Sequence, residues 1–124
     1  MCACIAIIDD DATFLDFLQA LLLDEGYEVL KMKDGRTAFD RLCALRPDCI
    51  IVDVRLEHPT SGWDILAHVW GDPTFAATPA IVLSGDVMDL EAHRQELEQR
   101  GCVCLAKPFD IDDLLDALGR LLPA

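Results

Sequence analysis

Short apolar runs alternate along the chain with segments in which apolar residues recur every three or four positions. The runs have the length and composition of strands, several of them apolar throughout as in a sheet buried on both faces. They are Cys4 to Ile8, Glu28 to Leu30 or Lys31, Cys49 to Asp53, Ala80 to Ser84, and Cys102 to Ala106. The segments between and after them place their apolar residues on one face of a helix. Those residues are Phe14, Leu18, Leu21 and Leu22; Ala38, Leu42 and Leu45; Ile65, Leu66 and Val69; Leu90 and Leu97; and Leu114, Leu115, Leu118, Leu121 and Leu122.

Residues that start or stop helices stand where these segments change. Gly26 is placed to end the first helix, and Pro47 requires the second to end before it. Asp34 and Asp110 are predicted to cap the second and the last helix. Five strands alternating with five helices require crossover connections, so the sequence predicts an α/β fold, a doubly wound parallel sheet covered on both faces. We expect one domain over residues 1–124, with no room for an output domain.

Polar residues collect where the predicted strands end. Asp9 and Asp10 follow the first strand, Asp53 ends the third, Ser84 ends the fourth and Lys107 follows the fifth. In open parallel sheets the functional crevice lies beyond the carboxyl ends of the strands. These side chains are therefore predicted to meet in one crevice.

Three converging carboxylates repel one another unless a cation lies between them, and carboxylate oxygens favour Mg²⁺ or Mn²⁺ over zinc. Such a metal could join a carboxylate to a phosphoryl oxygen, while Lys107 adds a positive charge and Ser84 a hydroxyl donor. Asp53 lies between the two groups, so it is the predicted nucleophile.

The charge balance excludes one class of partner. The formal net charge of −13 repels phosphate backbones, so we expect no binding to nucleic acid. The apolar runs are too short to cross a membrane, and the apolar start of the chain lacks the basic residues of a secretory or transit signal. We therefore expect a soluble cytoplasmic protein without a membrane partner.

Six cysteines raise the question of a metal or a disulfide. They stand at positions 2, 4, 43, 49, 102 and 104. The two Cys-x-Cys pairs lie in apolar runs rather than in the turns that carry structural zinc ligands. We expect buried, reduced cysteines, as in a reducing compartment.

Four motifs together resemble the receiver domain of two-component response regulators, of the single-domain type related to chemotaxis regulators. They are Asp9-Asp10 after an apolar strand, Ile-Ile-Val-Asp ending at Asp53, Leu83-Ser84-Gly85, and Lys107-Pro108-Phe109. The resemblance spans nearly the whole chain. It implies a flavodoxin-like sheet in the strand order 2-1-3-4-5, in which the first and fifth strands, and so the two Cys-x-Cys pairs, are not neighbours.

The resemblance also implies roles for individual residues. Asp53 would accept the phosphoryl group, and Ser84 and Lys107 would contact it. The metal, Mg²⁺ or Mn²⁺, would be held by the carboxylates of Asp9, Asp10 and Asp53 and by the backbone carbonyl of Arg55.

In this family a histidine kinase or phosphotransfer protein is the donor, and phosphorylation switches binding to a downstream protein partner. The sequence does not specify this downstream partner, and it is compatible with a homodimer. The domain would be a phosphoacceptor phosphoprotein in signal transduction, not an enzyme, although it assists its own phosphorylation and dephosphorylation.

The sequence departs from the family pattern at two positions. Gly62 stands nine residues after Asp53 instead of eight, so the loop between them is longer by about one residue. Cys104 stands where the family usually has the Tyr or Phe that takes part in switching. We therefore predict that switching relies on Ser84 and the loop after it. We also predict that Arg55 and Asp86, two residues beyond Asp53 and Ser84, form an ion pair that slows hydrolysis of the acyl phosphate.

Two other functions share these residues. An aspartyl-phosphate phosphatase of the haloacid-dehalogenase type would have Asp-x-Asp, but the residue two after Asp53 is Arg55. The general acid and base of such an enzyme is then missing. A phosphorylation-silent module with the same fold would only bind partners, and the full set of polar residues argues against it.

Overall fold

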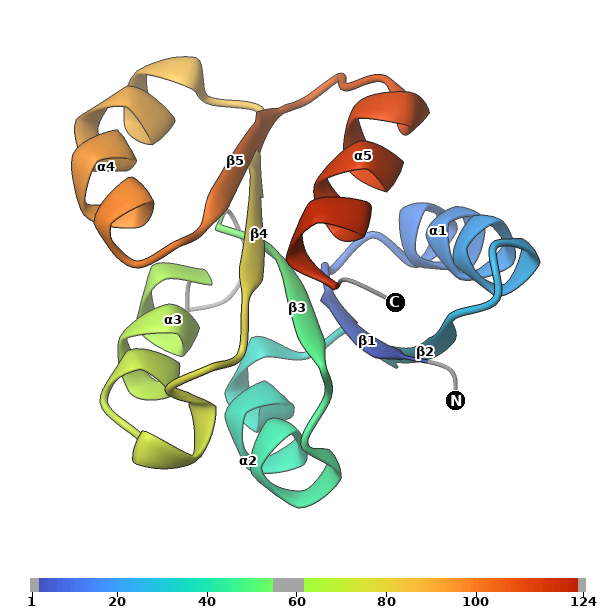
Figure 1. The fold of residues 1–124 in the computed structure, drawn as a ribbon, viewed down its shortest axis with the longest axis horizontal. Helices are drawn as coiled ribbons and strands as arrows, with labels where there is room; N and C mark the ends of the chain where they lie inside the picture. Colours follow the sequence, from blue (N-terminus) through green and yellow to red (C-terminus); the bar gives the residue numbers. More distant parts are fainter. Residues whose placement is uncertain (1–2, 55–61, 123–124) are drawn as a thin grey trace.

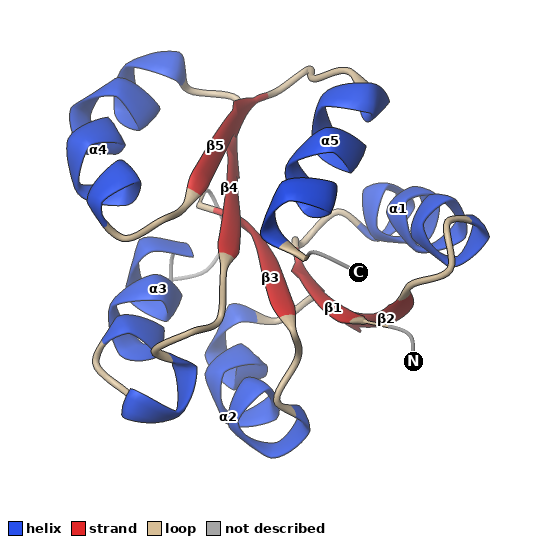
Figure 2. Cartoon of the chain, viewed as in Figure 1, coloured by secondary structure: helices blue, strands red, loops and turns tan. Residues whose placement is uncertain are grey.

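The computed structural model describes residues 3–54 and 62–122 of the chain. Its strands are β1 (Cys4–Ile8), β2 (Glu28–Met32), β3 (Cys49–Asp53), β4 (Ala80–Ser84) and β5 (Val103–Ala106). Its α-helices are α1 (Ala12–Asp24), α2 (Gly35–Leu45), α3 (Gly62–Trp70), α4 (Val87–Gln99) and α5 (Ile111–Leu121). All strand pairs are parallel, in the order β2-β1-β3-β4-β5 (Figures 1 and 2). This confirms the predicted doubly wound α/β fold and its strand order.

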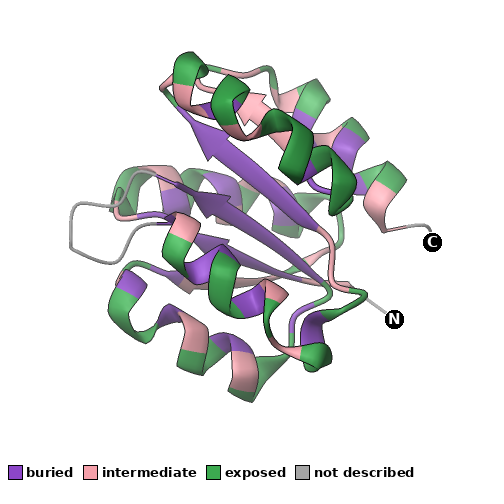
Figure 3. Cartoon of the chain, turned by 90° about the vertical axis from the view of Figure 1, so that its left-hand side faces the viewer, coloured by how far each residue is buried: buried purple, intermediate pink, exposed green. Residues whose placement is uncertain are grey.

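The sheet is covered on both faces, as Figure 1 shows, with α1 and α5 on one side and α2, α3 and α4 on the other. Successive residues of a strand point to opposite faces, so each strand contributes to two cores. Ile5 and Ile7 of β1 pack in the cluster with α1 and α5, whereas Ala6 and Ile8 pack in the cluster with the other three helices. Figure 3 shows the buried central strands between helices with exposed outer faces.

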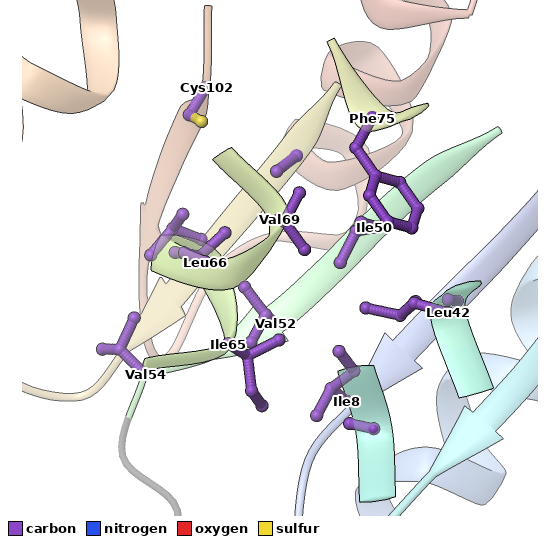
Figure 4. Close-up of a cluster of buried hydrophobic side chains, with 14 of the residues drawn as sticks. Ile8, Leu42, Ile50, Val52, Val54, Ile65, Leu66, Val69, Phe75 and Cys102 are labelled. Atoms are coloured by element: carbon purple, nitrogen blue, oxygen red, sulfur yellow. The ribbon is translucent and has the colours of Figure 1, made fainter. Parts of the chain in front are cut away.

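The larger of the two cores lies between the sheet and helices α2, α3 and α4. The residues labelled in Figure 4 belong to it: Ile8, Leu42, Ile50, Val52, Val54, Ile65, Leu66, Val69, Phe75 and Cys102. Residues of this size contribute about 1.5–3 kcal/mol each when they are fully buried. The apolar helix faces predicted from the sequence therefore fix which side of each helix lies on the sheet.

Aspartates begin several of the helices. The Asp11 carboxylate accepts from the backbone N–H groups of Thr13 and Phe14, and Asp34 accepts from that of Arg36. Asp110 occupies the same position before α5, but its side chain makes no capping hydrogen bond. Asp110 is therefore the N-cap residue of α5, as predicted, but it caps the helix without a side-chain hydrogen bond, and α5 depends on its buried apolar face.

Element boundaries differ from the predicted ones where pairing decides them. Strand β2 continues to Met32 because Met32 pairs with Ile8 and is buried. Strand β5 begins at Val103, so Cys102 lies just before the sheet. A short 3₁₀ turn, Pro73–Phe75, was not predicted. No helix within residues 3–54 and 62–122 is long and apolar enough to cross a membrane.

Candidate functional site

The predicted polar residues meet at the carboxyl ends of the central strands. Asp9 follows β1, Asp53 ends β3, Ser84 ends β4 and Lys107 follows β5. Backbone hydrogen bonds hold these strand ends in register, from Lys107 N–H to the Ser84 carbonyl at 2.8 Å and from Val54 N–H to the Leu83 carbonyl at 3.1 Å. The parallel sheet thus brings together residues that are far apart in the sequence.

The Lys107 ammonium joins two carboxylates. Its Nζ lies 2.7 Å from Asp53 Oδ2 and 2.9 Å from Asp9 Oδ2. The Asp9 and Asp53 side chains are 2% and 10% exposed, and the Lys107 side chain is 26% exposed. Charge-assisted hydrogen bonds of this length in a partly dehydrated site are strong. The lysine therefore orients the carboxylate predicted to be the nucleophile.

The protonation equilibria reflect an excess of negative charge. Burial raises the pKa of Asp9, and the Asp11 N–H and the Lys107 ammonium offset this only in part. Burial alone would lower the pKa of Lys107, but the hydrogen bonds and charges of Asp53 and Asp9 outweigh it and raise that pKa above its ordinary value. The raised pKa of Lys107 follows from two carboxylates sharing one ammonium, which leaves a net negative charge in the crevice that attracts a further cation.

An aromatic residue from α1 completes the surroundings of the lysine. Lys107 Nζ lies 4.3 Å from the centre of the Phe14 ring, and Phe14 meets Phe109 edge to face at 6.2 Å. A cation above an aromatic face is attracted to it. The helical periodicity predicted Phe14 only as a core residue, and nothing local in the sequence indicated its contact with Lys107.

The structure describes three of the four predicted metal ligands. Asp9 and Asp53 converge on Lys107, and Asp10 follows Asp9 as a half-buried residue. Among residues 3–54 and 62–122, no three His, Cys, Asp or Glu side chains lie ready as ligands of one ion. Arg55, the predicted backbone ligand, lies outside the described residues, as do the rest of the loop through Ser61 and the predicted pairing of Arg55 with Asp86. The chemistry of the described carboxylates still fits a hard divalent cation, since hard oxygen donors carry the excess charge.

Ser84 is buried, and its hydroxyl is engaged with the start of α4. Asp86 N–H donates to Ser84 Oγ at 2.9 Å. Asp86 in turn caps α4, because its carboxylate accepts from Asp89 N–H at 3.1 Å. Ser84 thus belongs to the site through its strand and to α4 through its side chain.

Gly62 supports Asp53 from the backbone side. A Cβ at position 62 would overlap the carbonyl oxygen of Asp53 and the Cα of Val54. Gly62 N–H also donates to the Val54 carbonyl at 3.1 Å. The first residue of α3 is therefore packed directly against the strand end that carries Asp53, a contact that allows no side chain.

The cysteines are separate from this site. Those in the described residues, Cys4, Cys43, Cys49, Cys102 and Cys104, are free thiols. Burial raises the pKa of Cys49 to about 12 and that of Cys102 to about 11. Strands β3 and β4 separate β1 from β5, so Cys4 and Cys104 are not on neighbouring strands, as expected. Cys104 is half-buried against the α2–α4 core.

Comparisons with known proteins agree with one another. A model of the response regulator receiver domain matches residues 5–119. The chain is 26% identical over 119 residues to sporulation initiation phosphotransferase F of Bacillus subtilis (strain 168), which covers 96% of this chain and 93% of that protein. It is 30% identical over 122 residues to response regulator MprA of Mycolicibacterium vanbaalenii, covering 95% of this chain but only 49% of that protein. It therefore spans about half the length of MprA.

A solved structure shows the same arrangement. The chemotaxis response regulator CheY4 of Vibrio cholerae superposes with a TM-score of 0.85 at 30% sequence identity. The match covers 98% of this chain and the whole of that one. The likeness therefore extends across the sheet and both helical layers.

Proposed function

Because this chain belongs to the response regulator receiver domain family, we propose that it accepts a phosphoryl group on the Asp53 carboxylate and thereby changes the surface it offers to a partner. Receiver domains are phosphoacceptors of two-component signalling rather than enzymes in the usual sense. The observation that carries the proposal is the hydrogen bond of Lys107 to both Asp9 and Asp53 in a crevice closed to most solvent. It supports Asp53 as an oriented nucleophile.

In the proposed reaction an Asp53 oxygen attacks the phosphorus of a phosphohistidine. The P–N bond of the donor breaks, an acyl phosphate forms, and the electron pair returns to the imidazole. Lys107 supplies positive charge for the phosphoryl oxygens, and the Ser84 hydroxyl can donate to one of them. Asp9 keeps Lys107 in place through its 2.9 Å contact.

Receiver domains generally bind Mg²⁺ at the phosphorylation site. Here Asp9, Asp10, Asp53 and the carbonyl of Arg55 would hold Mg²⁺ or Mn²⁺, which when bound would neutralise charge on the transferred group. The excess negative charge that raises the pKa of Lys107 supports this assignment.

Receiver domains interact with histidine kinases or phosphotransfer proteins, so one of these is the proposed donor. The proposed compartment is the reducing cytoplasm, which suits the free thiols among the described cysteines. Three further points remain predictions. They are a downstream protein partner, a possible homodimer, and a single domain over residues 1–124.

The experiment compares wild type with Asp53→Asn after treatment with acetyl phosphate and Mg²⁺. Asp113→Asn, which alters an exposed carboxylate on α5, is the matched control. Intact-protein mass spectrometry should show one added, hydroxylamine-labile phosphoryl group in the wild type and the control and none in Asp53→Asn. Equal labelling of Asp53→Asn would exclude this nucleophile. Rapid turnover of the phosphodonor would favour the phosphatase alternative, and no labelling of the wild type the phosphorylation-silent module.

A further inference from the structure

The start of α3 is tied to α4 by a single tryptophan. Trp63 Nε1–H donates to Asp89 Oδ2 at 3.0 Å. Its indole stacks on the His93 ring, with the ring centres 3.9 Å apart and the planes inclined by 23°. Asp89 and His93 stand one turn apart on α4, so Trp63 contacts the first half of that helix through both a hydrogen bond and a ring face.

Both ends of this contact lead to the candidate phosphorylation site. On the α3 side, Trp63 directly follows Gly62, which packs on the backbone of Asp53. On the α4 side, Asp89 N–H donates to the Asp86 carboxylate, and Asp86 N–H donates to Ser84 Oγ. A continuous series of packed or hydrogen-bonded groups thus runs from Asp53 through Trp63 to Ser84.

Cys104 stands where the family usually has the Tyr or Phe that takes part in switching, but it cannot couple Ser84 to a helix in that way. Cys104 lacks an aromatic ring, and it is half-buried on the α4 side of the sheet. A thiol at this position has neither the size nor the strong hydrogen-bonding group to follow a change at Ser84.

We propose that Trp63 is the positioning residue that couples the state of Asp53 and Ser84 to helix α4, through its hydrogen bond to Asp89 and its stack on His93. This inference rests on the proposed phosphorylation of Asp53. When the Ser84 hydroxyl turns to donate to a phosphoryl oxygen, its bond with Asp86 N–H changes, and the first turn of α4 adjusts. The indole, whose backbone directly follows the Gly62 that packs on Asp53, fixes the direction of that adjustment.

The consequence is a change in an exposed apolar surface. Val87 and Met88 in the first turn of α4 are 54% and 80% exposed, next to Asp89. A shift of this turn alters how these two side chains are presented to a protein partner. The proposed device therefore converts a charge change in the crevice into a change of an apolar contact surface.

The test uses beryllofluoride with Mg²⁺ as the probe of the phosphorylated state, followed by ¹H–¹⁵N NMR. In wild type, the Trp63 indole N–H resonance should shift on adding the probe, and it should shift more than that of Trp70. In Trp63→Phe, which keeps a ring beside His93 but removes the donor to Asp89, the probe-induced shifts of the Val87 to Leu90 amides should fall by more than half. Bound beryllofluoride, measured by ¹⁹F NMR, should persist in this variant.

Trp70→Phe is the matched control. Trp70 lies on the same helix α3 and also reaches α4, where Arg100 lies 4.3 Å above its ring, but it contacts the far end of that helix. This variant should keep the wild-type shifts at Val87 to Leu90. Wild-type shifts in Trp63→Phe, or an unmoved Trp63 indole in a wild-type protein that binds the probe, would overturn the coupling role alone. A wild type that binds no beryllofluoride would overturn the proposed function and this inference with it.

Discussion

Replacing Lys107 with methionine should destabilise the fold even without any phosphodonor. The substitution keeps an unbranched apolar stem beside Phe14 but removes the ammonium that lies 2.7 Å from Asp53 and 2.9 Å from Asp9. Removing one partner from a buried ion pair costs about 3–5 kcal/mol, because charge is left in a poorly solvated site. Since the Lys107 side chain is 26% exposed, we expect the lower end, about 3 kcal/mol of unfolding free energy.

The deficit should depend on pH. Burial already raises the pKa of Asp9 above its ordinary value of 3.8, and loss of Lys107 removes interactions that lower it. In the variant, folded Asp9 then holds its proton at a higher pH than unfolded Asp9 does. Its stability should therefore fall as the pH rises from 3.8 through the folded pKa. The deficit relative to wild type should be smaller at about pH 5 than at about pH 8.

Urea unfolding followed by far-UV circular dichroism, with EDTA present, measures these differences. Lys31→Met is the matched control, because Lys31 pairs at 2.8 Å with Asp16, whose side chain is 70% exposed, whereas the carboxylates that pair with Lys107 are buried. That surface pair should contribute only about 0–1 kcal/mol. Adding Asp53→Asn to Lys107→Met should recover part of the loss, since it removes one of the two repelling carboxylates. Equal losses in the two single lysine variants, or no recovery in the double variant, would refute the electrostatic explanation.

Two other substitutions or modifications test the packing. Gly62→Ala should lower the free energy of unfolding by about 1–3 kcal/mol, because the new methyl group meets the backbone of Asp53 and Val54. Gly119→Ala in α5, which has open space at its Cβ, should raise it by up to about 1 kcal/mol. Urea midpoints that rank the two variants the other way would contradict the close approach of Gly62 to the strand. The Cys49 thiol is buried, and its pKa is raised to about 12, so it should resist iodoacetamide at neutral pH in the folded protein and react in urea. Peptide mapping that finds equally fast labelling in both states would show that β3 is not closed to solvent.

Local patterns in the sequence were enough for the elements and for the chemistry of the site. A run such as Cys49–Asp53 is apolar at every position, and a helix such as α5 repeats leucines at three and four residues, so their type follows from periodicity alone. Asp9, Asp53, Ser84 and Lys107 could be predicted as neighbours because parallel strands end at one edge of a sheet. The strand order itself was implied by the resemblance to receiver domains and not by the pattern.

Which side chains touch one another depended on the folded arrangement of distant segments. The bond of Lys107 to Asp9 joins residues 98 positions apart, and that of Trp63 to Asp89 joins helices on separate crossover units. Such contacts depend on strand order, on helix packing and on side-chain length together, so no local signal encodes them. At Asp110 a local signal did not predict the contact: aspartate is a favourable capping residue, but its side chain makes no capping hydrogen bond in the folded protein. In this protein, local residue patterns therefore specify the strands and α-helices, and long-range packing specifies which charges share the crevice and which helix is tied to it.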